Sequence, residues 1–288
     1  MSLARARGAL TIAAAVVALT ASYAAQRQAT FSAGVEVVRV DALVTDGARV
    51  VTGLGPSDFS VRDNGVPQDV EIASFEQVPL TVVLVLDASE SVVGPRLEHL
   101  RAAGVAALDG LTRRDQAALL TFNQSVSVAS RRTTDIDAVR TAIQRIRPGG
   151  GTALYDAIHS GIVLGQAGEG RTLVLVFTDG TDTSSFLTKE SVRDTARRSD
   201  AVVYGAIEGT RTPFLKDLAA ETGGAVFTVS STRDLPGLFV RICEEFRQRY
   251  LIGYSPRGVA RAGWHRIDVS VKGRSYSVKA KSGYQIGR

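Results

Sequence analysis

The sequence predicts an α/β protein built around a doubly wound, mostly parallel sheet. Between residues 81 and 247, apolar runs of strand length alternate with amphipathic segments of helix length. On both sides of this region the hydrophobic period changes to two, which is typical of antiparallel strands. The 288 residues, 44% of them hydrophobic, are enough for a substantial core. We therefore expect the doubly wound sheet to be inserted in a small antiparallel β domain.

The central region provides six strands and the helices that connect them. Two of the strands are separated only by Asn123 and Gln124, which is too short for a crossover, so they must form an antiparallel hairpin. The first predicted helix carries an apolar face from Leu97 to Leu111. The predicted strands are 81–87, 116–122, 125–130, 172–179, 201–207 and 225–229, and the later helices are 135–146, 152–166, 188–199, 213–222 and 232–247.

The flanking segments, 30–78 and 249–288, are predicted to form short strands. Turn signals stand at Asp46-Gly47 and Asn64-Gly65, and Lys272-Gly273-Arg274 predicts a turn between strands at 265–271 and 275–281. Neither flank alone has enough long strands to be stable. We therefore predict that the two flanks pair into one β domain and that residues 79–248 are inserted between them.

The N-terminal residues 1–24 resemble an export signal. Arg5 and Arg7 precede an uncharged run from Ala9 to Ala21, and small residues follow at Ser22 and Ala24. This run is too short to span a bilayer comfortably, so we expect a cleaved signal peptide, with an uncleaved anchor as the alternative. The mature chain is then predicted to be secreted, periplasmic or in the cell envelope, with no membrane span.

Composition argues against several classes of partner and chemistry. Loss of the two arginines of residues 1–24 lowers the formal net charge from +5 to +3, and this excess is spread along the chain rather than clustered as in nucleic-acid binding. The single cysteine, Cys243, excludes an intrachain disulfide, and its helical spacing with apolar residues predicts a buried thiol.

Oxygen-bearing side chains collect where the predicted strands end. Asp87, Ser89 and Ser91 follow the strand 81–87, Asp179 ends the strand 172–179, and Thr152 follows three glycines. In an open α/β sheet, ligands bind beyond the carboxyl ends of the strands. Carboxylate and hydroxyl oxygens suit a hard divalent cation, so we predict a site for Mg²⁺, with Mn²⁺ or Ca²⁺ as alternatives.

Two residues near this edge have more than one interpretation. Thr152 opens a predicted helix and could also serve as its N-cap. Asp182 either supports the ligands from a second shell or is a solvated loop acid.

These residues resemble a known family. Asp87-Ala88-Ser89-Glu90-Ser91 is similar to the DxSxS signature of the von Willebrand factor type A domain, and Thr152 and Asp179 match that family's threonine and distal aspartate. The resemblance implies a metal-ion-dependent adhesion site and a sheet of strand order 3-2-1-4-5-6 with one antiparallel edge strand. The segments Val44 to Gln68 and Tyr250 to Pro256 also resemble the flanks of a bacterial group related to this family.

The family implies that the metal ion binds an Asp or Glu of a partner protein. We expect an exported, non-enzymatic binding module whose partner is recognised by the loops 88–95, 123–125, 148–153 and 180–187. Two alternatives remain: a structural scaffold without metal, and a Mg²⁺-dependent phosphotransferase of the haloacid dehalogenase type. The latter needs an acid two residues after Asp87, where this chain has Ser89. Nucleotide, serine-hydrolase and zinc sites lack their motifs.

Overall fold

The computed structural model describes residues 37–75, 78–167, 170–209 and 212–287. The signal peptide predicted at residues 1–24 lies outside this part of the chain. Within the described ranges, no helix combines the length and the apolar character needed to cross a bilayer.

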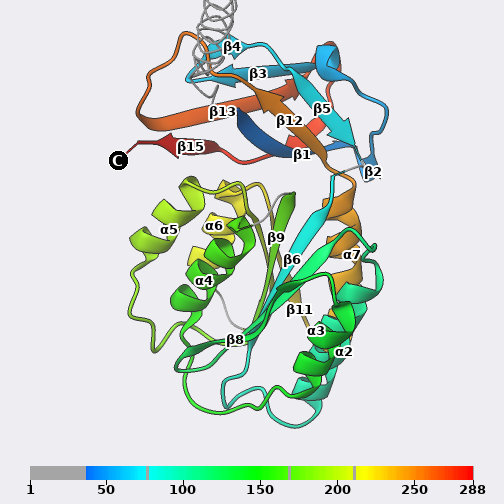
Figure 1. Cartoon of the computed structure of the whole chain (residues 1–288), viewed down its shortest axis with the longest axis vertical. Coiled ribbons are helices and arrows are strands. Elements are labelled where there is room, and N and C mark those ends of the chain that lie inside the picture. The colour runs from blue at the N-terminus through cyan, green and yellow to red at the C-terminus, as the bar shows by residue number, and fades with distance from the viewer. Residues whose placement is uncertain (1–36, 76–77, 168–169, 210–211, 288) are drawn as a thin grey trace, which may run out of the picture. The chain divides into compact units, whose positions relative to one another are not determined.

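A six-stranded sheet forms the centre of the α/β part (Figure 1). Its order is β11-β10-β9-β6-β7-β8, and all neighbours are parallel except the hairpin pair β7 and β8. Numbered from β6, this is the expected order 3-2-1-4-5-6 with an antiparallel edge, so the predicted fold class is confirmed. The strands are β6 (Leu80–Asp87), β7 (Gln116–Phe122), β8 (Val126–Thr133), β9 (Arg171–Thr178), β10 (Val202–Glu208) and β11 (Val226–Val229).

Helices cover both faces of this sheet because its strands are apolar on both sides. One face carries α2 (Pro95–Asp109), α3 (Ile136–Gln144) and α7 (Leu235–Arg247), the last preceded by the 3-10 turn η2 (Thr232–Asp234). The other face carries α4 (Leu154–Gln166), α5 (Lys189–Arg197) and α6 (Pro213–Glu221). Successive residues of β6 face opposite helix layers, which requires the continuous apolar run seen in the sequence.

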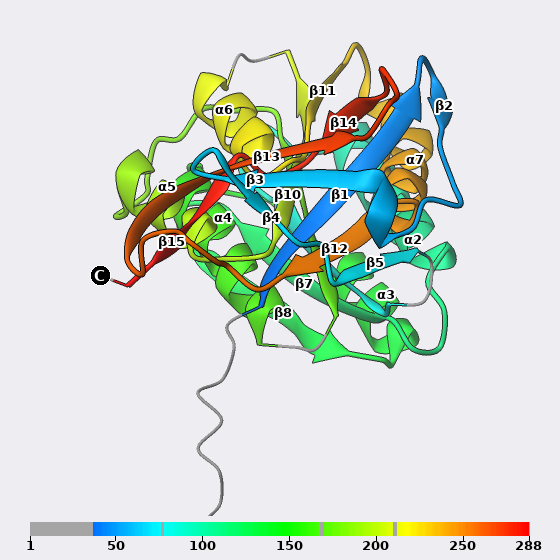
Figure 2. The same ribbon diagram turned by 90° about the horizontal axis from the view of Figure 1, so that it is seen from above.

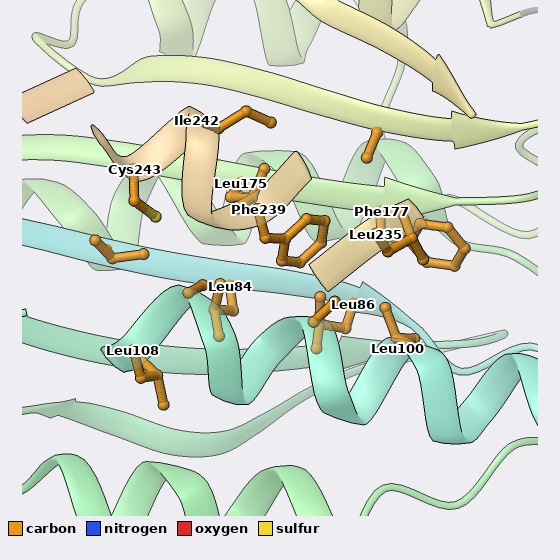
Figure 3. Close-up of a cluster of buried hydrophobic side chains, with 14 of the residues drawn as sticks. Leu84, Leu86, Leu100, Leu108, Leu175, Phe177, Leu235, Phe239, Ile242 and Cys243 are labelled. Atoms are coloured by element: carbon orange, nitrogen blue, oxygen red, sulfur yellow. The ribbon is translucent and has the colours of Figure 1, made fainter. Parts of the chain in front are cut away.

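Figure 3 shows the first of these two cores. Leu84 and Leu86 of β6 pack with Leu100 of α2 and Phe239 of α7. Cys243 lies in the same cluster, as its spacing predicted, and burial raises the pKa of its thiol to about 12. The thiol is therefore a neutral packing group.

The flanking segments form two antiparallel sheets in which leading and trailing strands pair (Figure 2). In one, β1 lies between β12 and β14; in the other, β13 lies between β3 and β15. The elements are β1 (Val38–Asp46), β2 (Arg49–Val50), the 3-10 turn η1 (Pro56–Asp58), β3 (Phe59–Asp63), β4 (Val66–Gln68), β5 (Ile72–Phe75), β12 (Tyr250–Tyr254), β13 (Gly263–Val271), β14 (Ser277–Lys279) and β15 (Gly283–Ile286). Val37–Arg288 form one compact unit, and the division into host and inserted domain stays a prediction.

The strand predicted at 275–281 is wrong in its length and in its pairing. Only Ser277–Lys279 form a strand, and this strand pairs with β1, while β15 pairs with β13. After residue 279 the chain leaves the strand direction because it contacts residues of the α/β part. Lys281 Nζ donates to Asp200 at 2.7 Å, and the Ser282 backbone N–H donates to the Glu221 carbonyl at 3.0 Å.

Asp41 of β1 is buried although the period-two pattern places it on a polar face. It forms a buried ion pair with Arg171, the first residue of β9. Arg171 also donates to the Phe246 carbonyl at 2.7 Å, near the end of α7. This arginine therefore joins β1, β9 and α7 through groups that are out of contact with water.

Candidate metal centre

Asp87 is the last residue of β6, and its side chain is fully buried. One carboxylate oxygen accepts the Ser89 backbone N–H at 2.8 Å, and the other accepts the Thr178 hydroxyl at 2.6 Å. Burial raises the pKa of Asp87, hydrogen bonds from Ser89 and Thr178 only partly offset that effect, and the nearby Asp179 adds to it. The site thus holds a carboxyl group whose charged form is poorly stabilised by the chain.

Hydroxyl groups connect this strand end to the end of β9. Ser89 Oγ and Ser91 Oγ lie 3.0 Å apart, and Ser91 Oγ donates to Asp179 Oδ1 at 2.7 Å. The structure therefore brings Ser89, Ser91 and Asp179 together with Asp87, although Asp179 lies 88 residues beyond Ser91 in the chain.

The glycine loop 149–151 is hydrogen-bonded to the loop that follows Asp87. The Gly149 N–H donates to the Ala88 carbonyl at 2.9 Å, and the Glu90 N–H donates to the Gly150 carbonyl at 3.0 Å. Gly150 has a φ of +80°, and a Cβ at this position would stand 2.1 Å from Gln124 Oε1. The positive φ favours glycine at this position, whereas the flexible side chain of Gln124 could move aside.

Thr152 leaves this loop and packs beside the end of β9. Its side chain is buried, and its Oγ1 lies 3.4 Å from the point where a Cβ on Gly180 would stand, next to Asp179. The backbone of Thr152 is fixed by Thr183, whose N–H donates to its carbonyl at 2.8 Å. The expected N-cap role is wrong, because α4 begins at Leu154 with Ala153 as its N-cap.

Asp182 supports the N-terminus of α4. Its Oδ1 accepts the Tyr155 backbone N–H at 3.2 Å and the Ser185 hydroxyl at 2.5 Å. Asp182 therefore has a positioning contact: it holds the loop 180–187 against the helix that follows Thr152.

Two charged residues at this edge were not anticipated. Glu208 ends β10, and Arg96 lies in the first turn of α2, where it forms ion pairs with Glu208 at 3.1 Å and with Asp179 at 3.4 Å. A carboxylate at the end of a predicted strand was the signal that identified Asp87 and Asp179, and the same signal identifies Glu208. Arg96 carried no comparable signal, because its direction depends on how α2 packs.

The donor set fits a hard divalent cation. The candidate donors are two carboxylates and the three hydroxyls of Ser89, Ser91 and Thr152, all oxygen, as Mg²⁺ prefers. Across the described ranges, no group of three or more His, Cys, Asp or Glu residues could hold a metal ion. Any ion at this edge therefore depends on hydroxyl groups as well as carboxylates.

A doubly wound α/β domain with hydroxyls and carboxylates at the carboxyl edge of its sheet defines a recognisable class. Residues 81–241, more than half of the chain, match the von Willebrand factor type A domain family. The chain belongs to this family, and the resemblance seen in the sequence is confirmed.

Individual relatives are more distant. The chain is 26% identical over 249 residues to a UPF0353 protein of Mycolicibacterium gilvum, covering 74% of this chain and 72% of that protein. It is 24% identical over 139 residues to inter-alpha-trypsin inhibitor heavy chain H2 of Sus scrofa, covering 44% of this chain but 15% of that protein. A solved von Willebrand factor type A structure from Catenulispora acidiphila has a TM-score of 0.54 at 13% identity, covering 83% of this chain and 75% of that chain, and supports the fold alone.

Proposed function

We propose that this protein is an exported, metal-dependent protein-binding module. In this proposal Asp87, Ser89, Ser91, Thr152 and Asp179 hold one Mg²⁺, Mn²⁺ or Ca²⁺ ion, and the ion coordinates an Asp or Glu of a partner protein. Membership of the family supports protein interaction as the general function. The bound metal ion, the acidic ligand of the partner and the export of the chain are what we propose in addition.

One observation carries the proposal. Four acidic residues of the described chain are buried, and three of them face a cationic or ionisable basic side chain: Asp41 faces Arg171, Asp63 faces His265, and Asp115 faces Arg247. Within the same described ranges, Asp87 has only hydroxyl and backbone N–H partners. A buried carboxylate without a cation is costly, and a metal ion removes that cost.

The chemistry of the donors suits binding rather than catalysis. With few anionic donors, a divalent ion keeps positive charge and attracts a further carboxylate. We propose that the chain is not an enzyme, because the residue two positions after Asp87, where a phosphotransferase needs an acid, is Ser89, and its hydroxyl contacts Ser91.

The rim of the site supports a protein as the partner. Phe186 in the loop 180–187 is 95% exposed, and its backbone N–H is held by Asp156 Oδ2 at 3.0 Å. Val93, in the loop that follows the serines, is 53% exposed. Large apolar side chains displayed on fixed loops are typical of protein contacts, and they favour a partner whose acidic residue has apolar neighbours.

We propose export because residues 1–24 begin with positively charged residues, continue with an apolar run and end with small residues, as an export signal does. Cleavage is tested by N-terminal sequencing of the protein recovered from the native cell envelope. A mature N-terminus close after residue 24 supports the proposal, and an intact N-terminus in a membrane fraction supports the uncleaved anchor.

The metal is tested by thermal unfolding with and without Mg²⁺ or Mn²⁺. We expect an increase in Tm for wild type, because a ligand that binds only the folded state stabilises it by about 1.4 kcal/mol at ten times its Kd. Asp87→Asn should lose this increase, and Asp69→Asn, which changes an exposed carboxylate, should keep it. No increase in wild type would favour the inert scaffold, and release of phosphate from phosphoesters would favour the enzyme.

A further inference from the structure

Arg96 links the ends of two neighbouring strands at the candidate metal centre. Its Nη1 lies 3.4 Å from Asp179 Oδ2 at the end of β9, and its Nε lies 3.1 Å from Glu208 Oε2 at the end of β10. Nη1 also donates to the Ser91 carbonyl at 3.3 Å. Arg96 therefore contacts two residues of the proposed ligand set and one carboxylate outside it.

These contacts leave Asp179 with defined partners on both oxygens. Oδ1 accepts the Ser91 hydroxyl at 2.7 Å, and Oδ2 faces the guanidinium of Arg96. Glu208 is similarly engaged: Oε1 accepts the Thr232 backbone N–H at 3.2 Å, and Oε2 faces Arg96. Both carboxylate side chains are mostly buried, whereas the side chain of Arg96 is about half exposed. The guanidinium therefore lies on the solvent side of two acids that it partly neutralises.

The charges at this edge of the sheet determine how Arg96 would affect the affinity for a metal ion. Asp87, Asp179 and Glu208 carry three negative charges, Arg96 carries one positive charge, and a divalent ion would bring the whole group to neutrality. Without Arg96 the group would hold the ion with one excess negative charge. A like charge near a divalent cation weakens its binding, and the same charge attracts an anionic ligand.

We infer that Arg96 determines the balance between metal affinity and affinity for an acidic ligand. This inference rests on the proposed function. Arg96 partly neutralises the ligand Asp179 and the neighbouring Glu208, so both attract the ion less and the ion keeps more of its positive charge for the carboxylate of a partner. Arg96 is a specificity-determining residue in this scheme, and Glu208 opposes it.

The inference predicts opposite effects on two affinities, which are measured on the full-length protein. The Kd for Mn²⁺ comes from electron paramagnetic resonance of the free ion, and the binding of acetate to the Mn²⁺-loaded protein comes from water-proton relaxation. Arg96→Gln should bind Mn²⁺ about ten-fold more tightly than wild type. It should bind acetate more weakly, by a factor of about three or more. Arg96→Lys should stay close to wild type in both affinities.

Two further variants complete the test. Glu208→Gln removes a negative charge from the same cluster, so it should bind Mn²⁺ several-fold more weakly and acetate more tightly; this variant also serves if Arg96→Gln does not fold. Arg140→Gln removes the same charge from α3, where Arg140 pairs with Asp109 at 2.7 Å, and should leave both affinities unchanged.

The outcomes separate the inference from the proposed function. If wild type and Arg140→Gln bind no Mn²⁺, the proposed function fails and the inference fails with it. If both bind Mn²⁺ but folded Arg96→Gln binds it no more tightly, or binds acetate as well as wild type does, the inference alone is overturned. Loss of both affinities in Arg96→Gln would mean a merely structural role.

Discussion

A buried aspartate lies at each end of strand β6, and the pKa of the two carboxyl groups is shifted in opposite directions. Asp87 is the last residue of the strand, and Asp115 accepts the backbone N–H of its first residue, Leu80, at 2.8 Å. Burial raises the pKa of Asp87. Burial also acts on Asp115, but hydrogen bonds from Arg247, Leu80 and Thr112 outweigh it and lower the pKa of that carboxyl.

The difference lies in the partner that each carboxylate has within the chain. Asp115 has Arg247 at 2.8 Å, so its charge is balanced by the folded chain itself. Asp87 has comparable burial and no cationic side chain within ion-pair distance among the described residues. Asp41 and Asp115 each pair with an arginine of the folded chain, whereas Asp87 is the buried aspartate for which we propose a cation from solution.

Replacement of Asp115 should have the largest effect on stability. Asp115→Asn removes the charge that pairs with Arg247 and weakens hydrogen bonds to two backbone N–H groups, so we expect a loss of about 3 kcal/mol in the free energy of unfolding. Urea denaturation measures this change. Asp69→Asn should change the same quantity by less than about 0.5 kcal/mol. A loss of similar size in both variants would remove the distinction drawn for Asp115.

The same replacement at the other end of the strand should not destabilise the protein when chelator is present. Asp87→Asn removes a buried charge that lacks a cation, and we expect a free energy of unfolding within about 1 kcal/mol of wild type, or above it. Urea denaturation in excess chelator gives the value. A loss as large as that of Asp115→Asn would show that the chain already stabilises the Asp87 carboxylate.

The dependence of stability on pH should also have opposite signs at the two residues. The folded-state pKa of Asp87 lies above 3.8, so between the two values the folded state holds a proton that the unfolded state has lost. Without metal, the free energy of unfolding of wild type should therefore fall relative to Asp87→Asn as the pH rises above 3.8. Saturating Mg²⁺ should remove this fall.

For Asp115 the sign is reversed. Its folded-state pKa lies below 3.8, so its contribution to stability is present above that pH and is lost as the pH falls through the folded-state value. Denaturation curves at a series of pH values, compared with each Asn variant, separate the two contributions. Equal slopes for the two differences would contradict the assignment.

The smallest effect on stability is expected at the rim of the site. Phe186→Ser removes an exposed side chain, so the free energy of unfolding should stay within about 0.5 kcal/mol of wild type, and the increase in Tm caused by Mg²⁺ should be the same as in wild type. Capture of a partner from the native envelope should decrease. Unchanged capture, in an experiment where chelator abolishes it, would exclude Phe186 from the contact surface.

Much of this site could be predicted from the sequence because strand ends obey a simple rule. Parallel strands that end at Asp87 and directly before Asp179 must place these residues at one edge, and the alternation of Ser89 and Ser91 brings the hydroxyls with them. Glu208 follows the same rule and was missed.

Other features depend on packing that local patterns do not encode. The direction of Arg96 follows from the seating of α2 against the ends of β9 and β10. The burial of Asp41 and the pairing of β14 with β1 follow from contacts with Arg171 and Asp200, each more than 75 residues away in the chain. Periodicity predicts which face of a strand is apolar, and it does not indicate which distant arginine or aspartate will meet the other face.

Anomalous diffraction from crystals grown with Mn²⁺ tests the central claim most directly. The expected result is one strong peak about 2.1 Å from a carboxylate oxygen of Asp87, with the hydroxyls of Ser89, Ser91 and Thr152 in its shell or one water away, and no such peak in Asp87→Asn. A peak at another site, or none at Asp87 in crystals soaked at saturating Mn²⁺, would contradict the claim that this buried carboxylate is completed by a metal ion.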